Sequence, residues 1–219
     1  MLDQFRMSER TVGRLGVYRR HLYHLATEGV NSVYSHQLAL AAGVTAAQVR
    51  RDLMVVGSNG SSTRGYDVRS LLTRLEAFLS GPAHQNVALV GVGNLGRAIL
   101  AYCTSRSGHL AILAAFDSDP DKVGRVIQGC RCHAMAEMPD VAAQGGIRTA
   151  LLAVPAPEAQ VVADQLVSAG IRGIVNFAPV HLRVPPFVHV ENVDIMISLE
   201  KVAFFARSGI AGEEVLEEV

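Results

Sequence analysis

Residues 86–99 read Asn-Val-Ala-Leu-Val-Gly-Val-Gly-Asn-Leu-Gly-Arg-Ala-Ile, an apolar run that ends in a Gly-x-Gly-x-x-Gly turn. The run predicts a buried strand, and the residues after the turn have helical spacing. A strand, a tight glycine turn and a helix N-terminus, in this order, form the phosphate site of dinucleotide-binding proteins. The stretch therefore predicts a dinucleotide site.

Each glycine of the turn has a separate task. Gly91 permits the turn, Gly93 lets the backbone approach the pyrophosphate, and Gly96 lets the helix pack closely on the strand. The free N–H groups and the positive dipole end of the helix then hold the negative charge. The contacts expected from this turn are Gly91, Val92, Gly93, Asn94, Leu95 and Gly96.

A second apolar run ends in Asp117, which lies 21 residues after Gly96. An acidic side chain at this place accepts hydrogen bonds from the ribose hydroxyls and repels a 2′-phosphate, which favours NAD(H) over NADP(H). Two alternatives stay open. Asp117 can be an ordinary strand-end cap, and the nearby Arg125 leaves room for NADP(H).

Three further apolar runs, at 149–155, 173–177 and 188–195, alternate with helical segments. This pattern predicts an α/β domain with a doubly wound parallel sheet, the Rossmann architecture, over residues 81–219. The domain shows no clear catalyst, because its histidines are scattered and none has a recognisable catalytic context. The pattern therefore favours a sensor over an enzyme.

A final helix is unusually apolar for a chain end, which indicates packing against a partner. Its apolar residues are Leu199, Val202, Ala203, Phe204 and Phe205.

Residues 1–80 predict a helical module. Leu15, Tyr18, Leu22 and Leu25 form one apolar stripe of a first helix. A short helix capped at Ser35 is expected to stop at Gly43, and Thr45 caps a third helix, 46–56, whose inward face is Val49, Leu53 and Val56. Two short helices joined by Gly-Val-Thr predict a helix-turn-helix motif within about 17–56.

The outer side of the third helix carries groups that read DNA bases and phosphates. The turn-rich segment 57–68 follows it and predicts a β-wing, with Arg64 at a tip that can enter a minor groove. The simpler alternative is a solvated, arginine-rich face on an ordinary helix bundle. The DNA-binding residues expected are Thr45, Ala47, Gln48, Arg50, Arg51 and Arg64.

The distribution of charge supports a DNA-binding role for residues 1–80 alone. Residues 1–80 hold ten arginines, no lysine and six acidic residues, whereas the remainder has an excess of acidic residues. A basic first third suggests that only this part meets a polyanion, and Gly81-Pro82 marks the domain boundary.

Composition narrows the class of protein further. The 219 residues are 49% hydrophobic and 18% charged, typical of a well-buried α/β protein. No long apolar stretch or signal peptide stands out, so we expect a cytoplasmic protein with no membrane partner and no metal site. Three cysteines, Cys103, Cys130 and Cys132, fit reduced thiols. Cys130 and Cys132 are expected in a surface turn, with a redox-active pair as the alternative.

The whole chain resembles the Rex family of redox-sensing transcriptional repressors. The most specific matching motifs are Gln48-Val-Arg-Arg-Asp-Leu53 and Asn176-Phe-Ala-Pro179, which occur together with the glycine turn. The resemblance implies a homodimer with winged-helix heads, NAD(H)-binding bodies and an exchanged last helix. It implies that NAD⁺ is compatible with operator binding and that NADH binding causes release.

The resemblance also implies further site residues. Additional nucleotide contacts fall on Val154, Pro155, Asn176, Phe177, Ala178 and Pro179. A redox-linked switch network falls on Arg20, Tyr102 and Asp194, for which a buried tyrosine and a helix cap are the simpler interpretations of the last two.

One departure from the family concerns the wing. The family's wing begins Phe-Gly-x-Phe-Gly and carries a basic pair after it, whereas this chain has Val56-Gly-Ser-Asn-Gly60 and then Ser61-Ser62. Arg64 then substitutes from a shifted position. Fewer positive groups predict fewer phosphate contacts and a shallower salt dependence.

The leading hypothesis is therefore a DNA-binding repressor that responds to the NADH/NAD⁺ ratio. A small NAD-dependent oxidoreductase with an accessory N-terminal bundle is the alternative from another class, and an NAD-binding scaffold with protein-binding helices is a third.

Overall fold

The computed structural model describes residues 7–61, 63–80, 85–104 and 110–208, and the chain divides into two compact units, 1–84 and 85–219. The predicted boundary at Gly81-Pro82 lies outside the described residues. Each unit has its own apolar core, as expected for a helical module followed by a doubly wound sheet.

The first unit is a winged helix-turn-helix. Its helices are α1 (Glu9–Thr27), α2 (Ser35–Ala42), α3 (Ala46–Val55) and α4 (Val68–Ser80), with β1 (Ser32–Val33) paired antiparallel to β2 (Tyr66–Asp67). The predicted stripe of α1 is buried at Leu15, Tyr18 and Leu22, where it meets α3 and α4. The cap of α2 was predicted wrongly by one residue, because Tyr34 precedes the helix and its N–H donates to Gln37 Oε1 at 2.8 Å.

The second unit is a seven-stranded sheet in the order β5-β6-β4-β3-β7-β8-β9. The strands are β3 (Gln85–Val90), β4 (Leu110–Asp117), β5 (Val126–Ile127), β6 (Cys130–Ala134), β7 (Thr149–Leu152), β8 (Gly173–Asn176) and β9 (His189–Asn192). All neighbours are parallel except the short β5–β6 hairpin at the edge. The order from β6 to β9 is that of dinucleotide-binding folds.

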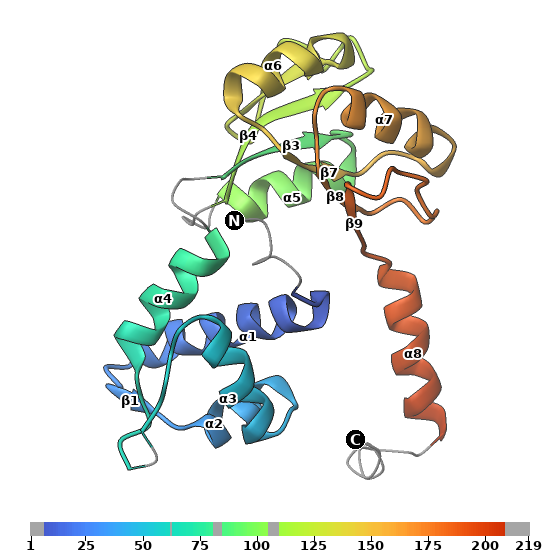
Figure 1. The fold of residues 1–219 in the computed structure, drawn as a ribbon. Coiled ribbons are helices and arrows are strands. Elements are labelled where there is room, and N and C mark those ends of the chain that lie inside the picture. Colours follow the sequence, from blue (N-terminus) through green and yellow to red (C-terminus); the bar gives the residue numbers. More distant parts are fainter. Residues whose placement is uncertain (1–6, 62, 81–84, 105–109, 209–219) are drawn as a thin grey trace. The chain divides into compact units, whose positions relative to one another are not determined.

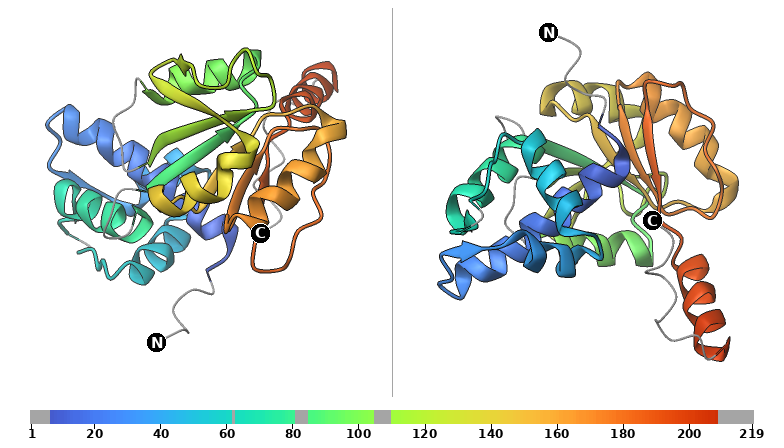
Figure 2. Two further views of the ribbon diagram at one scale, coloured as in Figure 1. Left: turned by 90° about the horizontal axis from the view of Figure 1, so that it is seen from above. Right: turned by 60° about the horizontal axis from the view of Figure 1, so that its bottom comes forward.

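Helices cover both faces of this sheet (Figures 1 and 2). The helix α5 (Asn94–Thr104) packs on one face against Leu89 and Ala115. The helices α6 (Met138–Gly145), preceded by the 3₁₀ turn η1 (Met135–Glu137), and α7 (Ala156–Ser168) pack on the other against Val90 and Phe116. Successive residues of a strand point alternately into the apolar layer on the α5 face and the apolar layer on the α6 and α7 face, because neighbouring side chains of a strand point to opposite faces.

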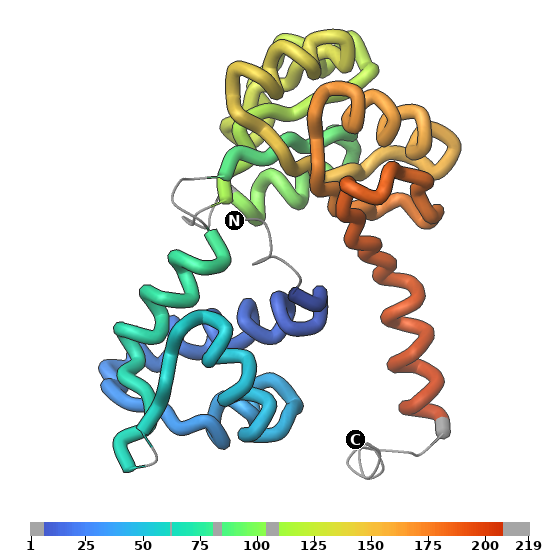
Figure 3. Tube along the Cα trace, in the orientation of Figure 1, coloured from blue at the N-terminus to red at the C-terminus, as the bar shows by residue number. Residues whose placement is uncertain are grey.

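Strand and helix do not alternate to the end, contrary to expectation. Residues 177–188 join β8 to the parallel β9 without a helix, and Figure 3 shows this irregular segment between α7 and α8 (Ile195–Ser208). Proline explains the difference, since Pro179, Pro185 and Pro186 remove backbone donors that a crossover helix needs.

The expectation for the cysteine pair was also wrong. Cys130 and Cys132 lie on β6, are buried, and belong to the core on the α5 face of the sheet. Burial raises the pKa of both thiols, which disfavours the reactive thiolate.

We therefore expect the folded protein to expose one reactive thiol at most. A thiol reagent at neutral pH is expected to modify the half-buried Cys103 of α5 and to spare Cys130 and Cys132 until the protein is unfolded. Mass spectrometry after timed labelling measures this. Modification of Cys130 or Cys132 at the rate of Cys103 would contradict it.

Candidate functional site

The predicted nucleotide residues gather at one edge of the sheet. Parallel strands β3, β4, β7 and β8 end in register, with Val90 beside Phe116 and Leu152, and Leu152 beside Asn176. The carboxyl ends of these strands therefore lie side by side. The segments that follow them are the glycine turn after β3, residues 153–155 after β7 and residues 177–179 after β8, and Asp117 ends β4 at the same edge. The strand order reverses between β3 and β7, and such a reversal is where ligands bind in open α/β sheets.

The three glycines of the turn are constrained differently. At Gly91, which has a φ of 92°, a Cβ would lie 2.5 Å from the carbonyl oxygen of Ala153. At Gly96 a Cβ would collide with the carbonyl oxygen of Gly91, so the start of α5 packs directly on the turn. At Gly93 a Cβ would meet no protein atom within 4 Å, so the protein's own packing does not require glycine there.

The surface beside Gly93 suits a phosphate group. Helix α5 begins at Asn94, and its first N–H groups have no acceptor within the helix. Gly93, Asn94 and Leu95 are exposed, and their backbone is open to a negatively charged ligand. In contrast, Val92 is buried and its N–H donates to Asp117 Oδ2 at 2.7 Å, so Val92 supports the turn from inside.

Asp117 holds the turn as well as ending β4. Its Oδ1 accepts from the N–H of Asp119 at 2.9 Å, and its Oδ2 also accepts from Lys122 Nζ at 3.1 Å. Burial alone would raise the pKa of Asp117, but these hydrogen bonds outweigh it and lower the pKa, so the carboxylate stays ionised. Lys122 was not singled out from the sequence, although its place five residues after Asp117 was a usable signal.

Asn176 shapes the loop that follows β8. Its buried amide donates to the carbonyl oxygens of Ala178 and Val180 and to Asn192 Oδ1, and accepts from the N–H of Ala178. These bonds occupy the Asn176 side chain and fix the course of Phe177, Ala178 and Pro179. Pro155 precedes α7, and both Val154 and Pro155 remain partly or fully exposed at the sheet edge.

The predicted turn residues of the helix-turn-helix end α2 and begin α3. Gly43 adopts a left-handed conformation with a φ of 63° and ends α2, while the Val44 N–H donates to the Ala39 carbonyl oxygen at 3.0 Å. Thr45 caps α3, since its side chain accepts from the Gln48 N–H at 3.2 Å. This geometry presents the N-terminal half of α3 at the surface.

The predicted DNA-binding residues of α3 are not equally free. Thr45, Ala47, Arg50 and Arg51 are exposed, with Arg50 Nη1 donating to Ser35 Oγ at 3.2 Å. Gln48 is half-buried between two polar partners. Its Nε2 donates to Asp52 Oδ1 at 2.8 Å, and its Oε1 accepts from Arg51 Nη1 at 3.2 Å.

Asp52 is the residue that sequence reasoning missed. It is 2% exposed and accepts from Arg14 Nε at 2.7 Å, Arg14 Nη2 at 2.8 Å and the Tyr18 hydroxyl at 2.9 Å, in addition to Gln48. Burial tends to raise the pKa of Asp52, but the hydrogen bonds from Arg14, Gln48 and Tyr18 outweigh it and lower the pKa. Its signal was an acidic residue on the apolar face between Val49 and Leu53.

This ion pair predicts a pH-dependent stability. Because the folded pKa lies below the usual 3.8, the carboxylate contributes fully above that pH and loses its contribution as the pH falls through the folded pKa. We expect Asp52→Asn to cost about 3 kcal/mol at neutral pH, the low end for breaking a buried ion pair. Denaturant unfolding of both proteins measures the difference, which is expected to shrink at acid pH; a pH-independent difference would contradict it.

The wing is short and tightly built. Ser61 and Gly65 exchange backbone hydrogen bonds of 3.0 and 2.8 Å, and the Tyr34 hydroxyl donates to the Thr63 carbonyl oxygen at 3.1 Å. Arg64 lies exposed at this tip, as predicted for a minor-groove contact. The minor-groove contact of Arg64 stays a prediction.

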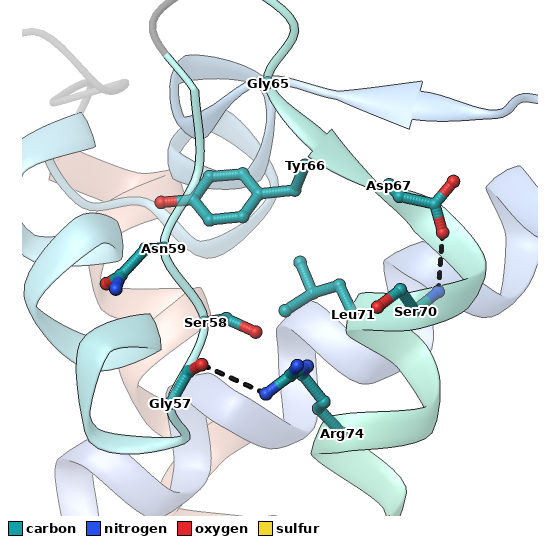
Figure 4. Close-up of a pocket in the computed structure, with 9 residues that line it drawn as sticks. All are labelled: Gly57, Ser58, Asn59, Gly65, Tyr66, Asp67, Ser70, Leu71 and Arg74. Carbon is teal, nitrogen blue, oxygen red and sulfur yellow. Dashed lines mark hydrogen bonds between the residues drawn. The ribbon is translucent and has the colours of Figure 1, made fainter.

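A pocket of about 200 Å³ lies where the wing stem meets α4 (Figure 4). The Arg74 guanidinium reaches across it to donate to the Gly57 carbonyl oxygen at 3.1 Å, and Asp67 accepts from the Ser70 N–H at 2.7 Å. The pocket is smaller than typical ligand sites. The two hydrogen bonds connect the wing stem, Gly57 at one end and Asp67 at the other, to α4.

The predicted switch residues are spread over both units. Arg20 is exposed on α1, and Tyr102 on α5 is 57% exposed, so the buried-tyrosine alternative is wrong. Asp194 Oδ1 accepts from the N–H groups of Met196 and Ile197 at 2.8 and 3.0 Å, which makes it the cap of α8. A network among the three remains a prediction.

Among residues 7–61, 63–80, 85–104 and 110–208, no group of three His, Cys, Asp or Glu side chains gathers as metal ligands. Within the same ranges, no helix is long and apolar enough to span a bilayer.

Fold and sites together define a class of protein: a winged-helix unit of the DNA-binding type joined to a dinucleotide-binding unit. Family models agree, since residues 6–53 match "Putative DNA-binding protein N-terminus" and residues 83–180 match "CoA binding domain". Among curated relatives, the redox-sensing transcriptional repressor Rex of Lactobacillus gasseri is 39% identical over 94% of this chain and 97% of its own length. The Rex protein of Desulfitobacterium hafniense is 38% identical over 93% and 97%.

Solved structures agree with the curated relatives. The Rex-family repressor RSP superposes with a TM-score of 0.81 at 33% identity, covering 93% of this chain and 95% of RSP. RSP in complex with β-NAD⁺ and operator DNA superposes with a TM-score of 0.82, covering 94% and 99%, also at 33% identity. The chain belongs to the Rex family of redox-sensing transcriptional repressors.

Proposed function

We propose that this protein is a repressor that binds operator DNA through α3 and the wing and leaves it when NADH occupies the glycine turn. The observation that carries the proposal is the exposed backbone at Gly93 in a chain that also presents Arg50 and Arg51 on a helix-turn-helix. One surface receives the signal and the other acts on DNA. Binding at the two is coupled because each ligand favours a different arrangement of the protein.

Relatives support both halves of this proposal. RSP has been solved in complex with β-NADH and in complex with β-NAD⁺ and operator DNA. On this chain, we assign phosphate contacts to the exposed backbone at residues 93–95 and ribose contacts to Asp117. An ionised Asp117 retains acceptor capacity beyond the three hydrogen bonds that it accepts within the described residues, since a carboxylate offers about four lone-pair sites.

We infer that the working form is a cytoplasmic homodimer. Helix α8 exposes Ile195, Met196, Ile197, Leu199, Val202, Phe204 and Phe205, each more than half accessible, and a second copy of the chain would cover them. Two heads then meet two half-sites of an operator. Arg20, Tyr102 and Asp194 are proposed to connect nucleotide state to this dimer.

We infer further that the nucleotide is a signal and undergoes no reaction here. The described histidines of the second unit lie apart: His133 is on β6 and His189 is on β9, near opposite sides of the strand order, and His181 is in the segment before β9. A small oxidoreductase remains the competing function, and turnover of NADH with carbonyl compounds would support it.

DNA binding measured against the NADH/NAD⁺ ratio tests the function. The wild type is expected to hold its preferred duplex with NAD⁺ and to release it as NADH rises. DNA binding that saturating NADH leaves unchanged would overturn the proposal.

A matched variant separates the two surfaces. Arg51→Ala removes one exposed cation from α3 and is expected to weaken DNA binding about 5- to 150-fold, the range for one good base contact. NADH affinity, measured by nucleotide fluorescence, is expected to stay as in the wild type. A parallel loss of NADH affinity would show that the variant damages the whole protein.

A further inference from the structure

The Asp52 carboxylate collects four donors in the described residues, and they divide between its two oxygens. Oδ2 accepts from Arg14 Nε and the Tyr18 hydroxyl, whereas Oδ1 accepts from Arg14 Nη2 and Gln48 Nε2. Gln48 is the only one of these three partners that lies on α3 itself. The buried carboxylate therefore connects the core of the first unit to a side chain at the edge of its exposed helix face.

The chemistry of its neighbours fixes which way the Gln48 amide points. Ionised Asp52 only accepts hydrogen bonds, so the amide atom beside it must be the NH₂ group. The Arg51 guanidinium only donates, so the amide atom beside it must be the oxygen. A flipped amide would place donor against donor and acceptor against acceptor.

With its orientation fixed, the Gln48 amide still has one donor and one acceptor that can bind a base. One hydrogen on Nε2 and one lone pair on Oε1 remain after the bonds to Asp52 and Arg51. In the major groove, adenine presents an acceptor at N7 beside a donor at N6, which matches this pair. Guanine presents acceptors at both N7 and O6, so the locked oxygen would face an acceptor.

We propose that Asp52 is a positioning residue that locks the Gln48 amide, so that α3 selects adenine over guanine at one base pair of each half-site. This inference rests on the proposed function, because it concerns how the same helix reads DNA. Arg14 contributes by holding Asp52 in a bidentate pair from α1, and side chains held by such surrounding contacts give the more precise recognition.

The test uses the duplex that the full-length wild type selects from a random pool in the presence of NAD⁺, with each base pair then replaced in turn. The wild type is expected to discriminate adenine from guanine at one position about 5- to 150-fold. Gln48→Met, which removes both amide groups, is expected to abolish that preference. The isosteric Asp52→Leu is expected to reduce it severalfold, because the amide is then oriented only by the exposed Arg51 and can turn and donate to guanine.

Two variants control for folding. Tyr18→Phe removes a donor to Oδ2 but leaves the Gln48 bond to Oδ1, so it is expected to lower the unfolding midpoint while keeping the adenine preference. If Asp52→Leu alone does not fold, Arg14→Leu combined with Asp52→Leu replaces the pair by apolar residues, a change that proteins often tolerate.

The outcomes separate the two proposals. A wild type that retains no duplex overturns DNA binding and this inference together. A sequence-selective wild type whose base preferences survive in Gln48→Met, or in a folded variant lacking Asp52, overturns the positioning role alone. An equal loss of preference in Tyr18→Phe also overturns it, since that variant leaves the Gln48 bond intact.

Discussion

Gly93→Ala is expected to fold as well as the wild type and to stay on DNA when NADH is added. The added Cβ meets no protein atom within 4 Å, and Gly93 is not among the glycines with positive φ, so the substitution brings no clash and no backbone strain. The same Cβ points into the space that the proposed pyrophosphate must approach. Forcing a methyl group into such a contact costs about 1–3 kcal/mol, or about 5- to 150-fold in NADH affinity.

Two matched variants isolate the cause. Gly96→Ala places its Cβ against the Gly91 carbonyl oxygen, so it is expected to lose NADH binding and stability together. Gly13→Ala on α1 also meets no atom within 4 Å, and it is expected to leave both NADH binding and release from DNA unchanged. Nucleotide fluorescence, thermal unfolding and DNA anisotropy measure the three properties. Normal NADH affinity in Gly93→Ala would show that the nucleotide does not pass this backbone.

The glycine turn was readable from sequence because everything that defines it is local. The apolar run of β3, the spacing of the three glycines and the start of α5 lie within 15 residues, and each requirement is met by residue types alone. The same holds for the turn at Gly43 and the Thr45 cap of α3. Such motifs leave one conformation open to the chain.

The Asp52 network was not readable, because it joins residues far apart. Arg14 and Asp52 are separated by 38 positions, and only the packing of α1 on α3 brings the guanidinium to the carboxylate. Periodicity places Asp52 on the same buried face as Val49 and Leu53, but it carries no information on which residue stabilises a carboxylate there. The partner that stabilises a buried charge is a property of the tertiary structure.

Two predictions about strands β6 and β9, near the two outer sides of the sheet, were wrong. Cys130 and Cys132 sit in a run with arginine and histidine, which looks like a turn, yet pairing of β6 with β4 buries them. Pairing also keeps β9 parallel to β8 across a segment without a helix. At β6, tertiary pairing overrode local propensity. Before β9, the local prolines already disfavoured a helix, and only the pairing with β8 shows that the strand is still parallel.

Leu199→Asp combined with Val202→Asp is expected to turn the proposed dimer into a monomer. Both side chains are more than half exposed on α8, and carboxylates there would be buried without partners in an interface with a second copy. Light scattering is expected to give 23.4 kDa for the variant and twice that mass for the wild type. Loss of the second head is expected to weaken operator binding about 100-fold or more, since the two half-sites no longer act together.

The control removes charge from the same helix without adding any to its apolar residues. Glu200→Gln combined with Lys201→Gln is expected to stay dimeric and to keep operator affinity, because both replacements remain polar. A dimeric Leu199→Asp, Val202→Asp variant would show that another surface joins the subunits.

The monomer also shows where the response to NADH resides. Its glycine turn is intact, so it is expected to bind NADH as tightly as the wild type. If the response depends on the spacing of two heads, the weak DNA binding that remains should be the same with and without NADH. A monomer whose DNA binding still falls with NADH would place the coupling within one chain, between the sheet edge and α3.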